Sequence, residues 1–258
     1  MELRAVLAAG RKIEAMWSAP RGVGLPTLVF LHEGLGSGPA WRDFPAQLGL
    51  RTGCGVLLYS RYGNGFSEPL HEPRTVAYMH DEALVALPAV LAAFDVVETI
   101  FIGHSDGASI ATIYACDRAG VRGLVLEAPH VFVEDLSIRS IGRAREAFAT
   151  GDLRERLARY HVDVDRTFYG WNDIWLDPAF RSWNIEAFAA GVRCPMLLVQ
   201  GEDDEYGTSA QLDAIRLRAV EAAVDELLLA RCGHAPHRDR PGAVMAAIAA
   251  FVETILKT

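Results

Sequence analysis

Short apolar runs recur along the chain, and stretches with helical periodicity separate most of them. We expect a strand at each of six such runs, at residues 27–31, 55–59, 99–102, 123–127, 196–200 and 226–230. Strands that are apolar on both faces are typical of a parallel sheet with helices on each side. Two strands flanking Gly10 predict an antiparallel edge, and residues 75–93 and the stretch around Ile248 predict helices. The pattern predicts an α/β fold with a mostly parallel, doubly wound sheet.

Residues 131–191 interrupt this alternation, because they are helical in pattern and contain no convincing strand. We interpret them as a helical cap inserted into a core that residues 1–130 and 192–258 form. Four large aromatic side chains of this segment are candidates to face a substrate: Phe168, Trp171, Trp175 and Trp183. A small helical insertion also needs large side chains to make a core of its own, so both interpretations stay open.

The composition is that of a globular chain and limits its partners. With 258 residues, of which 51% are hydrophobic and 22% charged, the chain fits one large α/β domain. Its net charge of -8 argues against nucleic acid or an anionic membrane as a partner, since each needs a concentrated basic face. The four cysteines lie far apart and predict neither a disulfide framework nor a zinc site. Without a signal-peptide or membrane-spanning pattern, we expect a cytoplasmic protein that binds a small molecule, and its oligomeric state stays open.

The apolar run that ends at Ile102 leads into the sequence Gly-His-Ser-Asp-Gly, with the serine at position 105. A G-x-S-x-G motif between a strand and a helix is typical of a nucleophile elbow, in which the serine occupies a sharp turn above the sheet edge. Residues two before and two after the serine must be small, and Gly103 and Gly107 meet that requirement. The sequence therefore predicts Ser105 as a nucleophile.

A serine hydroxyl needs a neutral imidazole as its base, and a carboxylate that orients the imidazole. The run at 196–200 leads directly into four acidic residues, Glu202, Asp203, Asp204 and Glu205. The last strand leads into Gly233 and His234. This chain order of serine, acid and histidine predicts one of the four acids as the orienting carboxylate and His234 as the base.

These motifs resemble those of the serine hydrolases of the α/β-hydrolase superfamily, of the esterase and thioesterase kind, over nearly the whole chain. The resemblance implies Asp204, the fourth residue of a G-x-x-D stretch, as the acid, with Asp203 as the runner-up. It implies His234 in a G-H-x-P segment as the base, and leaves His237 without a chemical role. A few relatives carry the acid after the sixth strand, where this chain has Glu127.

An acyl transfer also needs two backbone N–H groups that stabilise the developing oxyanion. One should be the amide of Asp106, whose carboxylate also suits the first turn of a helix. The resemblance implies that the second comes from the loop after residues 27–31, which often begins His-Gly but here reads His32-Glu33-Gly34. By position Gly34 is the donor, and the departure at Glu33 leaves Leu35 open. His32 either steadies this loop or is a buried structural residue.

Other chemistries on this fold compete with ester or thioester hydrolysis. Pro39 breaks the G-x-G-x-x-G pattern that a dinucleotide loop would need after Gly34. Ser105 excludes the dehalogenase and epoxide hydrolase mechanism, which needs an aspartate there. Hydrolases of carbon–carbon bonds in ring-fission products usually carry asparagine before the serine, where this chain has His104. A cofactor-free haloperoxidase-like activity and a non-catalytic ligand-binding protein stay as alternatives. We predict hydrolysis of a small ester or thioester without metal or organic cofactor.

Overall fold

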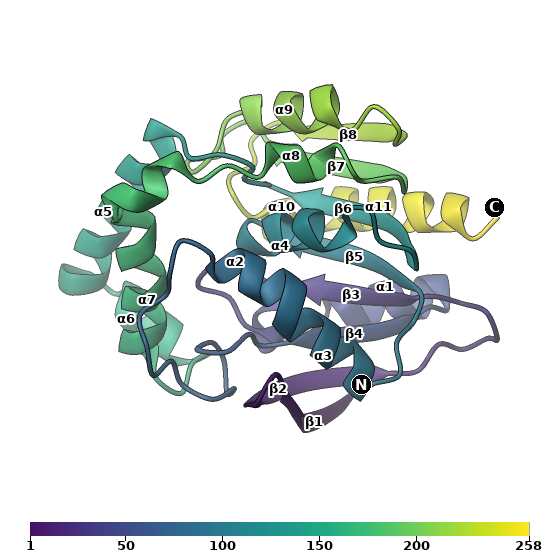
Figure 1. Ribbon diagram of the computed structural model, residues 1–258, viewed down its shortest axis with the longest axis horizontal. Helices are drawn as coiled ribbons and strands as arrows, with labels where there is room; N and C mark the ends of the chain where they lie inside the picture. The colour runs from purple at the N-terminus through teal and green to yellow at the C-terminus, as the bar shows by residue number, and fades with distance from the viewer. Residues whose placement is uncertain (258) are drawn as a thin grey trace.

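The computed structural model describes residues 1–257, and its centre is an eight-stranded sheet in the order β1-β2-β4-β3-β5-β6-β7-β8 (Figure 1). The strands are β1 Glu2–Ala8, β2 Arg11–Ser18, β3 Thr27–Leu31, β4 Gly55–Tyr59, β5 Thr99–His104, β6 Val121–Glu127, β7 Met196–Gly201 and β8 Val224–Leu229. Strand β2 pairs antiparallel with both β1 and β4, and every other pairing is parallel. The mostly parallel sheet predicted from the apolar runs is confirmed.

Helices cover both faces of the sheet (Figure 1). One layer holds α2 Tyr78–Asp81, α3 Leu87–Ala93, α4 Asp106–Ala115 and α9 Ala210–Arg218, and the other holds α1 Phe44–Thr52 and α11 Pro241–Ile255. Alternate residues of β3 enter the two layers, because Val29 belongs to one apolar cluster and Phe30 to the other. The sheet is therefore doubly wound. Within residues 1–257, none of the helices has the length and apolarity needed to cross a membrane.

The helix predicted at residues 75–93 is interrupted. It begins at Tyr78, and a π-helical turn, Glu82–Ala86, separates α2 from α3. Pro88 lies at the start of α3, where it has no N–H to donate and its ring crowds the carbonyl of the preceding turn. A wider turn relieves that crowding. The apolar pattern did not predict this π-helical turn before Pro88.

Residues 131–191 contain α5 Asp135–Thr150, α6 Leu153–Ala158, α7 Val164–Leu176, the 3₁₀ turn Pro178–Ser182 and α8 Glu186–Ala189. Helices α5–α7 lie together beyond one end of the strands, on the left of Figure 1. Helix α8 instead packs against α9 and α4, which belong to the layer that covers the sheet. The helical content predicted for this segment is present, and α8 is the part that joins the core layer. Two further short elements, η1 Gly38–Trp41 and α10 Pro236–Asp239, flank the strand ends.

Candidate active site

Ser105 lies in the turn between β5 and α4, with backbone angles of φ 54° and ψ −117°. A residue other than glycine rarely adopts a positive φ, so the surrounding structure must hold this conformation. A Cβ atom at Gly103 would collide with the backbone of Gly107, and one at Gly107 would collide with the carbonyl of Leu31. The structure confirms the steric requirement predicted for the two glycines, and the turn has the geometry of a nucleophile elbow.

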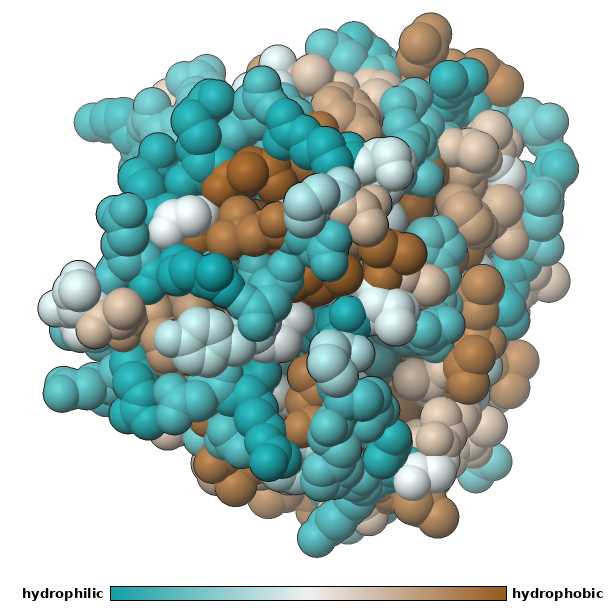
Figure 2. Space-filling model, turned by 60° about the vertical axis from the view of Figure 1, so that its left-hand side comes forward, coloured by the Kyte–Doolittle hydropathy of each residue, from teal (hydrophilic) through white to brown (hydrophobic). Residues whose placement is uncertain are grey.

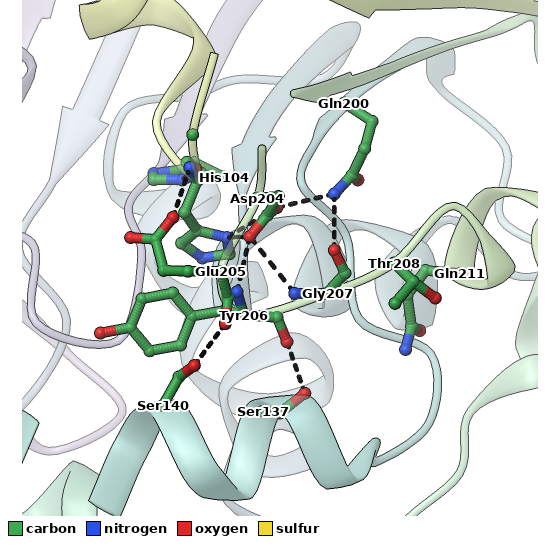
Figure 3. Close-up of polar contacts among 12 residues, drawn as sticks. His104, Ser137, Ser140, Gln200, Asp204, Glu205, Tyr206, Gly207, Thr208 and Gln211 are labelled. Atoms are coloured by element: carbon green, nitrogen blue, oxygen red, sulfur yellow. Dashed lines mark hydrogen bonds and ion pairs between the residues drawn. The ribbon is translucent and has the colours of Figure 1, made fainter. Parts of the chain in front are cut away.

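Asp204 and His234 are hydrogen-bonded partners. Nδ1 of His234 lies 2.9 Å from Oδ1 and 3.0 Å from Oδ2 of Asp204. The carboxylate also accepts hydrogen bonds from the amides of Tyr206 and Gly207 and from Nε2 of Gln200 (Figure 3). Burial alone would raise the pKa of the Asp204 carboxyl, but its bonds with His234 and with the amide of Tyr206 hold that pKa below its usual value. Asp204 is therefore an anion that orients the imidazole.

Of the other candidate acids, Glu205 accepts from the backbone amide of His234 at 3.2 Å, and none is bonded to its ring. Asp203 is exposed, and its amide donates to the carbonyl of Cys232. Glu127, at the end of β6, accepts instead from Nδ1 of His237 at 2.8 Å and from the amide of the same residue. Glu127 and His237 thus form a second carboxylate–histidine pair, which is buried.

A cavity of about 300 Å³ opens at Ser105, and its wall includes His234, Gly34, Leu35 and Asp106. Small ligand pockets begin at this size. Asp106 is the first residue of α4, where backbone N–H groups lack an acceptor within the helix. The two amides predicted as oxyanion donors therefore belong to residues on the wall that also holds the serine. Leu35 lies on the same wall and stays an alternative to Gly34.

Two of the four predicted aromatic residues line this cavity, namely Trp171 and Trp175 of α7. A Cβ at position 34 would collide with the indole of Trp171, which explains the need for glycine there. Phe168 is fully buried and stacks on Phe148 with ring centroids 3.8 Å apart. Trp183 stacks on Phe180. Phe168 and Trp183 do not line the cavity and match the other interpretation, in which large side chains form the core of the helical segment.

A chain of hydrogen bonds connects the helical segment with the residue that follows the serine. Nε1 of Trp175 donates to the hydroxyl of Tyr78 at 3.0 Å, and that hydroxyl donates to Oδ2 of Asp106 at 2.7 Å. The guanidinium of Arg61 lies 3.8 Å from the same carboxylate, and both groups are buried. The Tyr78 hydroxyl and the Arg61 guanidinium thus compensate the charge of the Asp106 carboxylate, in addition to any interaction with the helix dipole.

The loop that carries Gly34 is held by His32. Nδ1 of His32 donates to the carbonyl of Glu33 at 2.7 Å, and Nε2 accepts from the amide of Arg61 at 3.1 Å. Burial, followed by the charge of Arg61, lowers the pKa of His32 well below its usual value, so the ring is neutral. His32 is fully buried and also holds the loop, so the structure agrees with both roles considered for it.

A model of the alpha/beta hydrolase family matches residues 28–248 of the chain. The chain belongs to the alpha/beta hydrolase family. A relative at 29% identity over 252 residues is the 2-succinyl-6-hydroxy-2,4-cyclohexadiene-1-carboxylate synthase of Klebsiella pneumoniae, a match that covers 88% of this chain and 93% of the relative.

Solved structures of hydrolases share the fold. The proline iminopeptidase of Mycobacterium smegmatis superposes with a TM-score of 0.74 at 18% identity, covering 98% of each chain. The esterase RhEst1 of Rhodococcus superposes with a TM-score of 0.73 at 18% identity, covering 99% of this chain and 100% of the esterase. At such identities these two structures support the fold and leave the activity open.

Among the residues beside the cavity of this alpha/beta hydrolase that the sequence did not predict, Tyr206 and His130 lie next to His234. Tyr206 donates its amide to Asp204, and its ring lies 4.8 Å from that of His234. His130 follows β6, lines the cavity and is buried, which together with the charge of His234 lowers its pKa to about 3. Both residues follow parallel strands at the carboxyl edge of the sheet, the edge where ligands bind in such sheets. That rule is the signal that could have identified them.

Four histidines gather near the cavity. The ring centroid of His104 lies 5.1 Å from those of His234 and His237, and the ring of His130 lies 5.6 Å from that of His234. In the part of the chain that the structure describes, no group of three or more His, Cys, Asp and Glu side chains is arranged to hold a metal ion.

Proposed function

We propose that the protein is a serine hydrolase that cleaves a small carboxylic ester or thioester through an acyl-enzyme on Ser105. The observation that carries this proposal is the strained serine on one cavity wall with His234, whose other ring nitrogen is held by Asp204. A nucleophile, a base and an orienting carboxylate are the parts that acyl transfer needs. The family supports a hydrolase fold, and the ester specificity is our inference.

Each residue has one role in the proposed mechanism. Because Asp204 holds the hydrogen of Nδ1, Nε2 of His234 is free to accept the proton of Ser105 as the hydroxyl attacks the carbonyl carbon. The amides of Gly34 and Asp106 stabilise the oxyanion. His234 then donates its proton to the leaving alcohol or thiol, and later takes a proton from the water that releases the acyl group.

The cavity favours an acyl group of modest size with an apolar or aromatic part. Its volume is about 300 Å³, and Ile141, Trp171 and Trp175 supply apolar wall. Figure 2 views the molecule from the side of the helical segment and shows hydrophobic surface between rims of hydrophilic residues.

The charge at the cavity favours an acyl group without carboxylates. The product named for the Klebsiella relative carries a succinyl group and a carboxylate. The wall here includes Glu205 and Asp239, while its arginine, Arg238, is paired with Glu33 at 3.0 Å. A substrate with several carboxylates would meet repulsion from these acids. This difference supports ester or thioester cleavage over the reaction of that relative.

Hydrolysis of p-nitrophenyl acetate, butyrate and octanoate and of acyl-CoA thioesters, by the wild type and by Ser105→Ala, tests the proposal. We expect turnover of the short esters or thioesters, and its loss in the variant, which keeps the fold because alanine is smaller than serine. A folded wild type that turns over none of these compounds would direct attention to carbon–carbon bond hydrolysis or to a binding role.

A further inference from the structure

A residue that departs from the common pattern of this fold contacts the residue before the serine. Glu33 stands where the loop after β3 often has glycine, and His104 is the residue before the serine. Nδ1 of His104 lies 3.5 Å from Oε2 of Glu33. Neither residue was predicted to act on the other, and neither has a role in the proposed mechanism.

His104 also holds the loop of the catalytic base. Its Nε2 lies 2.6 Å from the backbone carbonyl of His234. A carbonyl only accepts hydrogen bonds, so Nε2 is the donor. The ring of His104 is almost fully buried and faces acceptors on both sides, the carbonyl and the Glu33 carboxylate. With Nε2 bonded to the carbonyl, Nδ1 faces the Glu33 carboxylate and has no hydrogen-bond partner among the residues described.

Glu33 connects this histidine with Arg238. Oε1 of Glu33 accepts from the guanidinium of Arg238 at 3.0 Å, on helix α10, which directly follows the His234 loop. Burial alone would raise the pKa of the Glu33 carboxyl, but the charge of Arg238 and the contact with His104 hold that pKa well below its usual range. The side chain folds across its own loop, since a Cβ at Gly36 would collide with Oε2 of Glu33.

Three of the four loops that carry the proposed catalytic groups thus contribute to one connected cluster. Glu33 precedes the oxyanion donor Gly34, and His104 precedes Ser105. His234 contributes its own carbonyl, and Arg238 follows it by one helical turn. We propose that Glu33, His104 and Arg238 are positioning residues that fix His234 relative to Ser105 and to the oxyanion donors. This inference rests on the proposed function.

Positioning and substrate binding predict different kinetics. A misplaced base or nucleophile slows the chemical step, and displacements of about 1 Å cost up to about 100-fold in rate. We expect Glu33→Gln to lower kcat with p-nitrophenyl butyrate by about 10- to 100-fold and to leave KM within about twofold. A change confined to KM would mean that Glu33 contacts the substrate, and would overturn the proposal.

The matched control is Glu68→Gln. Glu68 pairs with Arg11 at 2.9 Å and is 27% exposed against 18% for Glu33, and it lies outside the cavity wall. We expect this variant to keep the kcat of the wild type. Equal values of kcat for Glu33→Gln and Glu68→Gln would overturn the proposal.

A double-mutant cycle tests whether the residues act together. If His104 works through Glu33, the double variant Glu33→Gln with His104→Asn has a kcat no lower than that of the worse single variant. Effects that multiply would show independent roles and contradict the proposal. If His104→Asn does not fold, Arg238 supplies the second test: Arg238→Lys keeps most of kcat, and Arg238→Met loses as much as Glu33→Gln.

The rate at which a fluorophosphonate modifies Ser105 separates this inference from the proposed function. The reagent needs an activated serine and no particular acyl pocket. A wild type that reacts with it but cleaves no ester would overturn the proposed substrate class. The positioning proposal would stand if Glu33→Gln still slowed the modification by about 10-fold or more, and would fall if the rate were unchanged. A wild type inert to the reagent would overturn both.

Discussion

The molecule contains two carboxylate–histidine pairs that differ in what surrounds them. Asp204 and His234 form one, and Glu127 and His237 form the other, each with Nδ1 of the histidine on a carboxylate oxygen at 2.8–2.9 Å. His234 is 14% exposed and lines the cavity with Ser105, whereas His237 is 3% exposed and lies against Trp41, with ring centroids 4.3 Å apart. Access to a nucleophile, more than the pairing itself, distinguishes a base from a structural histidine.

The comparison predicts the largest effect at Asp204. We expect Asp204→Asn to lower kcat by about 10⁴-fold, because the amide no longer fixes the tautomer of His234 or stabilises its cation. Asp203→Asn, the neighbouring and exposed acid, is the matched control and should change kcat little. Steady-state kinetics on p-nitrophenyl butyrate measure both. Similar small losses in the two variants would contradict the assignment of the first pair.

The second pair should matter for stability instead. Glu127→Gln removes a charge from a fully buried site and weakens the hydrogen bonds with His237, so we expect the free energy of unfolding to fall by about 2 kcal/mol. Values of kcat should stay within about threefold, since the pair lies outside the cavity wall. Urea denaturation and kinetics on the same preparation provide the test. A large loss of kcat at unchanged stability would show that this pair takes part in the chemistry.

His130 sharpens the comparison, because it is a buried imidazole whose Nδ1 has no hydrogen-bond partner among the residues described. Its pKa of about 3 lies far below that of an unfolded histidine, so between pH 6.5 and 3 the unfolded chain binds a proton that the folded protein does not. Stability therefore falls as the pH decreases through this range. When the pH is lowered from about 7 to 5.5, the free energy of unfolding falls in the wild type. We expect it to fall by about 1 kcal/mol less in His130→Gln. Identical pH dependences of urea denaturation would show that His130 is not buried as described.

The parts of the site that the sequence predicted are those that local chemistry determines. Gly103 and Gly107 are required by the shape of one turn, and Asp204 and His234 lie where two predicted strands end. The parallel sheet brings those ends together at one edge, so chain order was enough to predict His234 and one of four acids. The family resemblance then indicated Asp204 among the four. The fold follows from the same apolar runs.

What the sequence did not predict depends on contacts between distant loops. The contact of Glu33 with His104 exists only because β3 and β5 are neighbours, and an acid after a strand does not reveal which histidine it will face. Trp183 and Phe168 could not be distinguished from Trp171 and Trp175 by residue type, since the packing of the helices decides which side chains reach the cavity.

The hydrogen bonds from Trp175 through Tyr78 to Asp106 limit how the helical segment can be exchanged between related proteins. Substituting the helical segment 131–191 with that of a related protein would leave the Tyr78 hydroxyl without its donor unless the incoming helix also carried one. With a helix that lacks such a donor, residues 78 and 106 would be exchanged together with the segment. The segment is continuous in sequence, yet the unit that preserves these hydrogen bonds is discontinuous.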